Sequence, residues 1–218
     1  MSARRAHHTA HALALSFACA LALTLTGALV PAHAAVTAPA STRSLAAGLA
    51  RGGRAEVTLR WTAPAIPGGR AERLRGTLAV EPPDRARLDV PATGERITLR
   101  SDGGEWLQPS LHQMMLLKAR HSVAAMRWWR LLAGAEPASE RRLGPRRYRL
   151  VLAATPAAPA DSAEVSLDAA GLPARLELDD GTGGRLVYEL SGWRFTRARG
   201  AAAFRVSAPA GIETVELP

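Results

Sequence analysis

Apolar and polar residues alternate with a period of two over most of the chain after residue 55. In residues 56–62, Val57, Leu59 and Trp61 alternate with polar side chains. Such alternation is typical of strands with one buried and one solvated face, as in antiparallel sheets. The same pattern predicts further strands around these apolar sets: Leu74, Gly76, Leu78 and Val80; Ala86, Leu88 and Val90; Ile97 and Leu99; Tyr148, Leu150 and Leu152; Ala163, Val165 and Leu167; Ala174, Leu176 and Leu178; Leu186, Tyr188 and Leu190; Phe204 and Val206.

Short segments rich in glycine and aspartate separate these predicted strands. They occupy residues 67–69, 92–94, 102–104, 169–173 and 179–181. Glycine and aspartate adopt the backbone conformations that tight turns require. We therefore expect consecutive strands to pair as a meander.

Two segments with helical spacing interrupt the alternation. Residues 41–51 predict a helix with Ser41 as its N-cap, Leu45 and Leu49 one turn apart, and Gly52 at its end. Residues 121–133 predict a second helix, with Ser122 as N-cap and Gly134 just past its end. Its apolar stripe would hold Val123, Met126, Trp129 and Leu132, with Arg127 and Arg130 on the other side.

The number of strands bears on the fold. Roughly nine to eleven strands, each apolar on one face, would form a flat sheet too wide for two short helices to cover. We therefore predict a mainly β fold with two or three helices: a curled antiparallel sheet, forming an incomplete β-barrel or half-barrel lidded by the helices. We expect apolar wall that the chain's own side chains do not fill, which an apolar ligand can occupy; a fully packed barrel is the alternative.

The first 34 residues have the layout of an export signal. Arg4 and Arg5 precede an apolar run over residues 12–30, and an A-x-A site ends at Ala34. This order predicts a secretory signal peptide cleaved after Ala34 and a periplasmic location. Residues 35–218 then form a single domain. The one cysteine, Cys19, lies in the signal, so we expect no disulfide in the mature chain.

The chain is basic, with 28 Lys and Arg against 19 Asp and Glu and a formal net charge of +9. A basic chain raises nucleic acid as a partner. Export and the presence of a single lysine, Lys118, argue against it, so we expect no nucleic-acid partner. The densest cluster of basic residues lies within residues 141–149. The favoured interpretation is a solvated hairpin; the alternative is a docking patch for an acidic partner or an anionic lipid surface. It contains Arg141, Arg142, Arg146, Arg147 and Arg149.

No sequence motif indicates catalysis. The chain lacks G-x-S-x-G and H-E-x-x-H, so we predict no enzymatic activity and no cofactor. His112, Met114, Met115, His121 and Met126 are soft ligands of the kind used in copper sites. Met114 and Met115 point to opposite faces of a strand, and no cysteine joins them, so we expect no metal site.

Three segments, taken in order, resemble the outer-membrane lipoprotein carrier (LolA-like) family. The first is GTLAV leading into PPDRARL at residues 76–88, and the second is ITLRSDGGEW at residues 97–106, followed by Pro109 and Gln113. The third is FRVSAPAGIE at residues 204–213. With the exported start and the early helix, the resemblance covers most of the mature chain.

The resemblance implies a function. It implies a half-barrel that carries the acyl chains of lipoproteins toward the outer membrane, with an inner-membrane release complex and an outer-membrane receptor as partners. The family commonly has an arginine that tethers the lid where this chain has Pro82; Arg85 or Arg87 would be its substitute. We expect a monomer. Because the sequence ends soon after its final predicted strand, a free carrier is favoured over a lipid-binding or envelope-sensing module of the same fold.

Ten residues are predicted to contact the lipid. Each buried methylene contributes about 0.8 kcal/mol, so an acyl chain requires only apolar surface. Methionine suits a lid because it adapts to irregular apolar shapes. The alternative for each residue is ordinary core packing. The predicted wall consists of Leu59, Trp61, Leu78, Leu88, Leu99 and Trp106, and the predicted lid of Met114, Leu116, Met126 and Trp129.

Overall fold

The computed structural model describes residues 38–63, 72–154, 160–179 and 185–217. The predicted signal peptide, its cleavage site and Cys19 lie outside these ranges, as does the predicted turn at residues 67–69. These stay predictions. In the described ranges, no helix has the length and apolarity needed to cross a bilayer.

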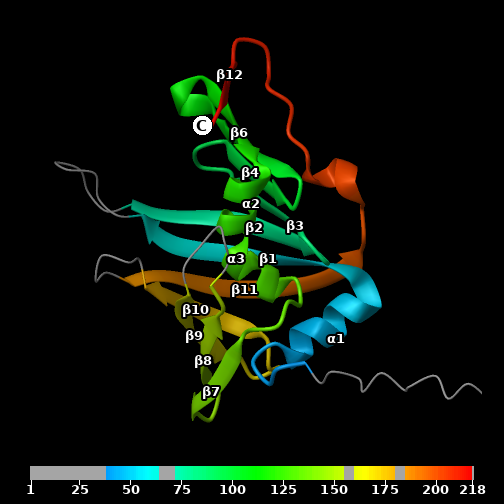
Figure 1. Ribbon diagram of the computed structural model, residues 1–218, viewed down its shortest axis with the longest axis vertical. Coiled ribbons are helices and arrows are strands. Elements are labelled where there is room, and N and C mark those ends of the chain that lie inside the picture. Colours follow the sequence, from blue (N-terminus) through cyan, green and yellow to red (C-terminus); the bar gives the residue numbers. More distant parts are fainter. Residues whose placement is uncertain (1–37, 64–71, 155–159, 180–184, 218) are drawn as a thin grey trace, which may run out of the picture. The chain divides into compact units, whose positions relative to one another are not determined.

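Twelve strands form one sheet, in the order β12-β6-β5-β4-β3-β2-β1-β11-β10-β9-β8-β7 (Figure 1). Two meanders, β1 to β6 and β7 to β11, meet where β1 pairs with β11. All pairs are antiparallel except β12 with β6. The strands are β1 (Gly53–Ala63), β2 (Glu72–Glu81), β3 (Arg85–Val90), β4 (Glu95–Arg100), β5 (Gly103–Gln108), β6 (Gln113–Lys118), β7 (Ser139–Gly144), β8 (Arg147–Leu152), β9 (Asp161–Leu167), β10 (Pro173–Asp179), β11 (Arg185–Arg197) and β12 (Glu213–Glu216).

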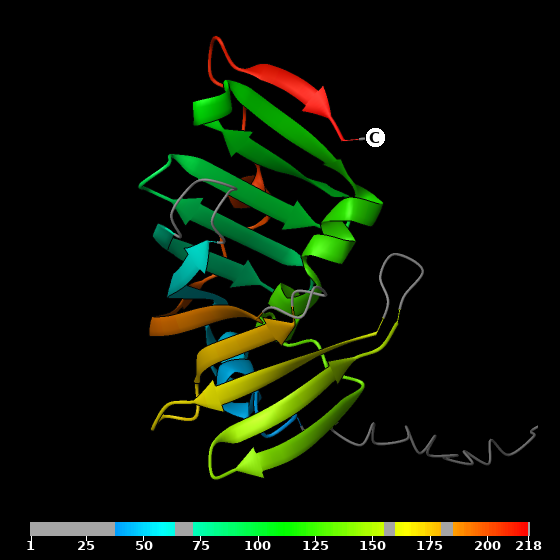
Figure 2. The ribbon, with the colours of Figure 1, turned by 90° about the vertical axis from the view of Figure 1, so that its left-hand side faces the viewer.

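The sheet curls but does not close into a barrel, because β12 and β7 stand at its two ends without pairing with each other (Figure 2). The described ranges also contain three α-helices, α1 (Arg43–Gly52), α2 (Ala119–Ala125) and α3 (Arg127–Leu132). Residues of α1 and α3, and Met126 between α2 and α3, belong to one apolar core cluster with the strands. The side of the sheet that carries this cluster is called the concave side below, and the opposite side the convex side. The predicted fold class is confirmed.

The first predicted helix is correct in place but not in its ends. Leu45 and Leu49 are buried as expected. Thr42, not Ser41, occupies the N-cap position, and it makes no side-chain cap bond. The backbone N–H and hydroxyl of Ser41 instead bond the carboxylate of Glu140 on β7. The helix ends one residue later than predicted, at Gly52, and the left-handed Gly53 (φ 86°) is its C-cap.

The second predicted helix is divided at Met126 into α2 and α3. Ser122 is not a cap but lies inside α2, fully buried. Gly134 follows the end of α3 with φ 95°, and its N–H donates to the Leu131 carbonyl at 3.1 Å, as predicted for a C-terminal glycine. Because the break changes the helical phase, Trp128 and Leu131 are buried together with the predicted Met126 and Leu132.

The predicted strand at Phe204 and Val206 is wrong. Phe204 ends a short 3₁₀ helix, η2 (Ala201–Phe204), and is fully buried. Arg87 and Arg100, which point to the convex side, donate to the carbonyls of Ala203 and Phe204 at 3.1 Å and 2.6 Å. The guanidinium of Arg54 lies 5.3 Å from the Phe204 ring centroid. Arginine contacts therefore hold this segment across the convex side, where no strand pairing is needed.

Candidate functional site

Cross-strand register aligns apolar side chains in a row along the concave side. Val57 on β1 pairs with Leu78, Leu78 with Leu88, and Leu88 with Ile97. The row continues through Trp106, Met115 and Val215 on β5, β6 and β12. Directly paired residues project from the same face of a sheet. Seven adjacent strands thus present one continuous apolar row, called the concave row below.

Three of the predicted wall residues are almost fully buried. Leu59, Leu78 and Leu99 are 0%, 1% and 3% exposed and belong to the same core cluster as Met126 of the helical segment. Helix α2 contacts β4, β5 and β6, and α3 contacts β3. The sequence led us to expect wall that the chain's own side chains would leave unfilled. The structure instead buries these three residues in that cluster.

Other predicted wall residues are only half-buried. Trp61, Leu88 and Trp106 retain partial exposure, as does Trp129 of α3. The Trp129 ring meets Tyr188 edge-on at 5.4 Å between centroids, and Tyr188 lies 6.1 Å from Trp61. Burial raises the pKa of the Tyr188 hydroxyl. An aromatic group thus joins α3 to β1 and β11 where the covering is incomplete.

Trp106 carries an unusual polar atom. Its indole nitrogen is buried and has no hydrogen-bond partner among the described residues. Buried donors in proteins are nearly always paired, so an isolated one calls for an explanation. Trp106 belongs to the concave row, between Ile97 and Met115. A ligand acceptor in this position could take up the unused N–H.

Two predicted lid residues are misplaced. Met114 and Leu116 lie on β6, not on a helix, and they pair with Leu107 and Glu105. Side chains alternate along a strand, so Met114 and Leu116 point to the convex side while Met115, between them, belongs to the concave row. The prediction failed because it took methionine content as a sign of a lid. Only Met126 and Trp129 belong to the helical segment α2–α3, called the lid below.

The lid is attached to one half of the sheet through Ser122. Its hydroxyl accepts the Arg100 backbone N–H at 3.0 Å and lies 2.6 Å and 2.9 Å from the carbonyl oxygens of Arg100 and Gly103. Ser122 is 0% exposed. This hydroxyl therefore fixes α2 to the turn between β4 and β5.

Helix α3 is attached to the other half. The Trp128 indole donates to the Asp161 carboxylate at 2.8 Å. The Arg127 guanidinium donates to the carbonyls of Ala153 and Leu152 at 2.8 Å and 3.3 Å. The lid thus bridges β4–β5 and β8–β9 across the concave side. Sequence reasoning missed these attachments, because the partners of Ser122 and Trp128 lie 19 to 33 residues away.

Neither predicted substitute for the lid tether contacts the lid. Arg85 pairs with Glu81 at 3.2 Å. Arg87 pairs with Asp89 at 2.9 Å and donates to Ala203. Both point to the convex side, so the suggestion that they replace the tether is wrong.

The soft-ligand set is spread apart rather than gathered. Met114 and Met115 lie on opposite sides of β6, His112 is exposed beyond η1 (Pro109–Leu111), and His121 accepts a bond from Arg120. Within the described ranges, no group of three or more His, Cys, Asp or Glu is placed to hold a metal ion.

The arginine cluster lies on the β7–β8 hairpin. Arg147 and Arg149 pair with Glu164 at 2.9 Å and 3.0 Å and lower the pKa of that carboxyl. Arg141, Arg142 and Arg146 are exposed. Two of the five arginines are thus neutralised within the sheet, and three remain on the surface.

Comparisons with known proteins gave matches only among solved structures. No family model matches the chain, and no curated protein matches it. A LolA superfamily protein from Nitrosomonas europaea is 13% identical, with 79% of this chain and 99% of that one covered and a TM-score of 0.44. A putative outer membrane lipoprotein-sorting protein domain from Vibrio parahaemolyticus is 11% identical, with 76% and 97% covered and a TM-score of 0.41. The lipoprotein LppX from Mycobacterium tuberculosis is 16% identical, with 71% and 93% covered and a TM-score of 0.36. Two of these names match the family that the motifs resemble, but identities and TM-scores this low do not assign a function.

Proposed function

We propose that this protein binds the acyl chains of lipoproteins, or of another lipid, between the concave row and the lid, and carries them through the periplasm toward the outer membrane. The observation that carries the proposal is the concave row itself. It is apolar across seven strands, and two short helices that contact β3 to β6 are attached beside it through a few polar groups. The proposed contacts are Leu59, Trp61, Leu78, Leu88, Leu99, Trp106, Met126 and Trp129.

Binding requires the lid to move. Because Leu59, Leu78 and Leu99 are buried in the same core cluster as Met126 of the lid, an acyl chain must displace core side chains to reach them. About a dozen buried methylenes contribute on the order of 10 kcal/mol before costs. This gain offsets the loss of lid packing without ATP at the carrier. Release then needs a receptor that binds the cargo more tightly or favours the open lid.

The half-buried residues of the concave side are the ones that an acyl chain would contact first. Trp61, Leu88 and Trp106 keep partly exposed side chains on the concave side, while Leu59 and Leu78 are fully buried. The free indole N–H of Trp106 offers a donor to the carbonyl of an acyl ester or amide. Such a contact would place the polar end of the cargo near β5 and its hydrocarbon beneath the lid.

Native mass spectrometry of the purified protein with a fatty acid and with an acylated peptide tests the proposal. We expect an apolar adduct and a change in tryptophan fluorescence, because three proposed contacts are tryptophans. Leu88→Gln places a polar amide in the concave row and should weaken the adduct at least tenfold. Leu111→Gln is the matched control, since Leu111 is 59% exposed on η1. The absence of both adduct and fluorescence change would remove the proposal.

A second experiment concerns the cellular task. Depletion of the protein should leave outer-membrane lipoproteins in the inner membrane if it sorts them. Correct sorting together with acyl binding in vitro would favour the alternative, a lipid-binding or envelope-sensing module.

A further inference from the structure

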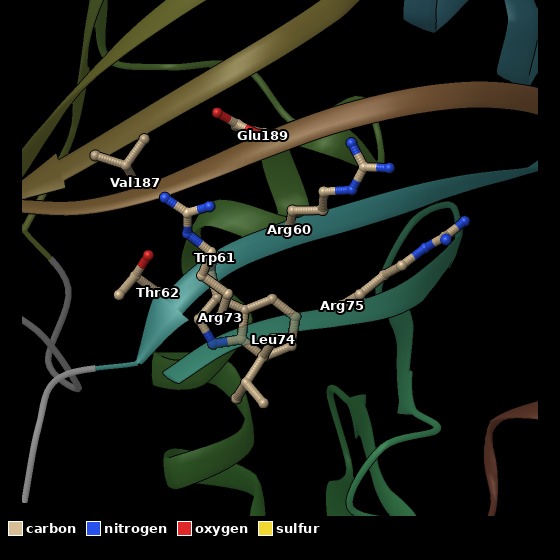
Figure 3. A pocket seen from close by; sticks show the side chains of 8 residues that line it. All are labelled: Arg60, Trp61, Thr62, Arg73, Leu74, Arg75, Val187 and Glu189. Atoms are coloured by element: carbon tan, nitrogen blue, oxygen red, sulfur yellow. The ribbon is translucent and has the colours of Figure 1, made fainter. Parts of the chain in front are cut away.

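The convex side of the β1–β2 hairpin carries a hollow that the proposed function does not use. It has a volume of about 580 Å³ and is lined by Arg60, Trp61, Thr62, Arg73, Leu74, Arg75, Val187 and Glu189 (Figure 3). The alternation of the strands turns the side chains of Trp61 and Leu74 toward the concave side, as Figure 3 shows. Its open surface is therefore formed mainly by polar and charged side chains.

Arg60, Arg73 and Arg75 dominate this hollow and are called the convex arginines below. Arg60 lies directly opposite Arg75, and Arg73 opposite Thr62. Like charges directly opposite each other destabilise a sheet. All three are exposed, and no ion pair among the described residues includes them. The one carboxylate in the lining is Glu189, across from Arg60 on β11.

This arrangement differs from that of other arginines on the convex side. Arg147 and Arg149 share Glu164, and Arg175 and Arg185 share Glu177. Arg194 pairs with Glu56 at 3.2 Å. These arginines share carboxylates, whereas the convex arginines, like Arg141, Arg142 and Arg146 of the β7–β8 hairpin, have no ion pair among the described residues. The convex arginines differ from the hairpin arginines in lining a hollow.

A second hollow adjoins the first and shares Arg75 with it. It is lined by Thr58, Arg75, Thr77 and Arg194 together with Val57, Gly192 and Trp193. The positive surface is therefore broad and shallow, which suits an array of anionic groups better than a single small anion.

We propose that the convex arginines dock the protein on an anionic phospholipid bilayer by binding lipid phosphate groups. Arginine forks fit phosphate oxygens, and each arginine near an anionic membrane adds to attraction. A protein partner would need an apolar centre with aromatic side chains, whereas Val187 is the one apolar side chain that this hollow presents on its own side. The lid lies on the other side of the sheet, so docking leaves the acyl site uncovered. The inference does not depend on the proposed function.

Vesicle flotation with the purified protein tests the docking. We expect binding to vesicles of phosphatidylglycerol and phosphatidylcholine, weak binding to phosphatidylcholine alone, and loss of binding at high salt. Each arginine should contribute about fivefold, so Arg60→Gln, Arg73→Gln and Arg75→Gln together should weaken binding on the order of 100-fold. Circular dichroism checks that the triple variant is folded, and its acyl binding should be unchanged.

The control variant combines Arg141→Gln, Arg142→Gln and Arg146→Gln. It removes the same charge from the exposed β7–β8 hairpin, so it should bind the vesicles within a few-fold of the wild type. An equal loss in both variants would overturn the inference, because net charge would then suffice. Equal binding to neutral vesicles, or binding of inorganic phosphate that the convex arginines govern without any vesicle binding, would also overturn it.

Discussion

Arg100 and Glu105 form a buried ion pair on the convex side of β4 and β5, with nitrogen–oxygen distances of 2.8 Å. The pair also holds the chain near η2, because Arg100 donates to the Phe204 carbonyl. Burial alone would raise the pKa of Glu105, but the bonds from Arg100 and Thr98 outweigh it and lower that pKa. The ionised carboxylate is therefore favoured by the folded state.

The pair predicts how stability depends on pH. A lowered pKa in the folded state stabilises the fold fully above the ordinary value of 4.5, and this stabilisation is lost as the pH falls through the lowered pKa. Glu105→Gln should reduce the free energy of unfolding by about 3 kcal/mol at pH 7, because it removes the buried charge partner of Arg100 and leaves only the exposed Asp102. Urea unfolding at pH 7 and pH 3 measures this, and the difference from the wild type should shrink at pH 3. Glu177→Gln, which affects an exposed cluster, should cost about 1 kcal/mol or less; an equal loss would contradict the argument.

At the scale of elements, the lid depends on a few polar attachments. Ser122→Ala should reduce the free energy of unfolding by about 1–3 kcal/mol, because it leaves the buried Arg100 N–H unpaired. It should also speed hydrogen exchange across residues 119–132 and hasten acyl entry. Ser110→Ala, at an exposed serine of η1, is the control and should change neither. Unchanged exchange in α2 would show that Ser122 does not hold the lid.

The attachment of α3 can be tested separately. Trp128→Phe keeps an aromatic ring in the core but removes the donor to Asp161. We expect faster exchange confined to α3, with a loss of about 1–2 kcal/mol in the free energy of unfolding. Trp193→Phe removes a different indole bond, to the Pro173 carbonyl on β10, and serves as the comparison. If both variants loosen α3 equally, the Asp161 contact has no particular role.

Some strands could be predicted from the sequence and others could not. Strands β1–β4 and β8–β11 were predictable because mainly apolar side chains on the concave face alternate with mainly polar side chains on the convex face. Strand β5 is buried on both faces and β12 is exposed on both, and neither alternates. The placement of Leu59, Leu78 and Leu88 on the concave side followed from the alternation. The attachments of Ser122 and Trp128 did not, since they depend on contacts between segments that only the folded chain brings together.

On the scale of the whole molecule, an open sheet has two end strands that could pair with another copy. Charged side chains protect both ends: Glu213 and Glu216 on β12, and Arg141 and Arg142 on β7. Strand β12 is also short and pairs with β6 in parallel. Parallel pairing is slightly less stable, so β12 is held more weakly than the antiparallel end strand β7. Its four residues are exposed, so its contribution to the core is small.

Removal of residues 213–218 should therefore change association more than stability. The truncation exposes the N–H and C=O groups of β6, a longer strand with the apolar Met114 to Leu117 at its centre. We expect the truncated protein to keep its fold, losing about 1–2 kcal/mol, but to form dimers or larger species because the exposed edge pairs with a second copy. Sedimentation velocity at increasing concentration measures this against the full chain, which we predict to be monomeric. Replacing Val215 with Lys in the full chain is the control, since it adds charge while keeping β12 in place and should leave a monomer. A truncated protein that stays monomeric at all concentrations would show that the curl of the sheet, rather than β12, protects this edge.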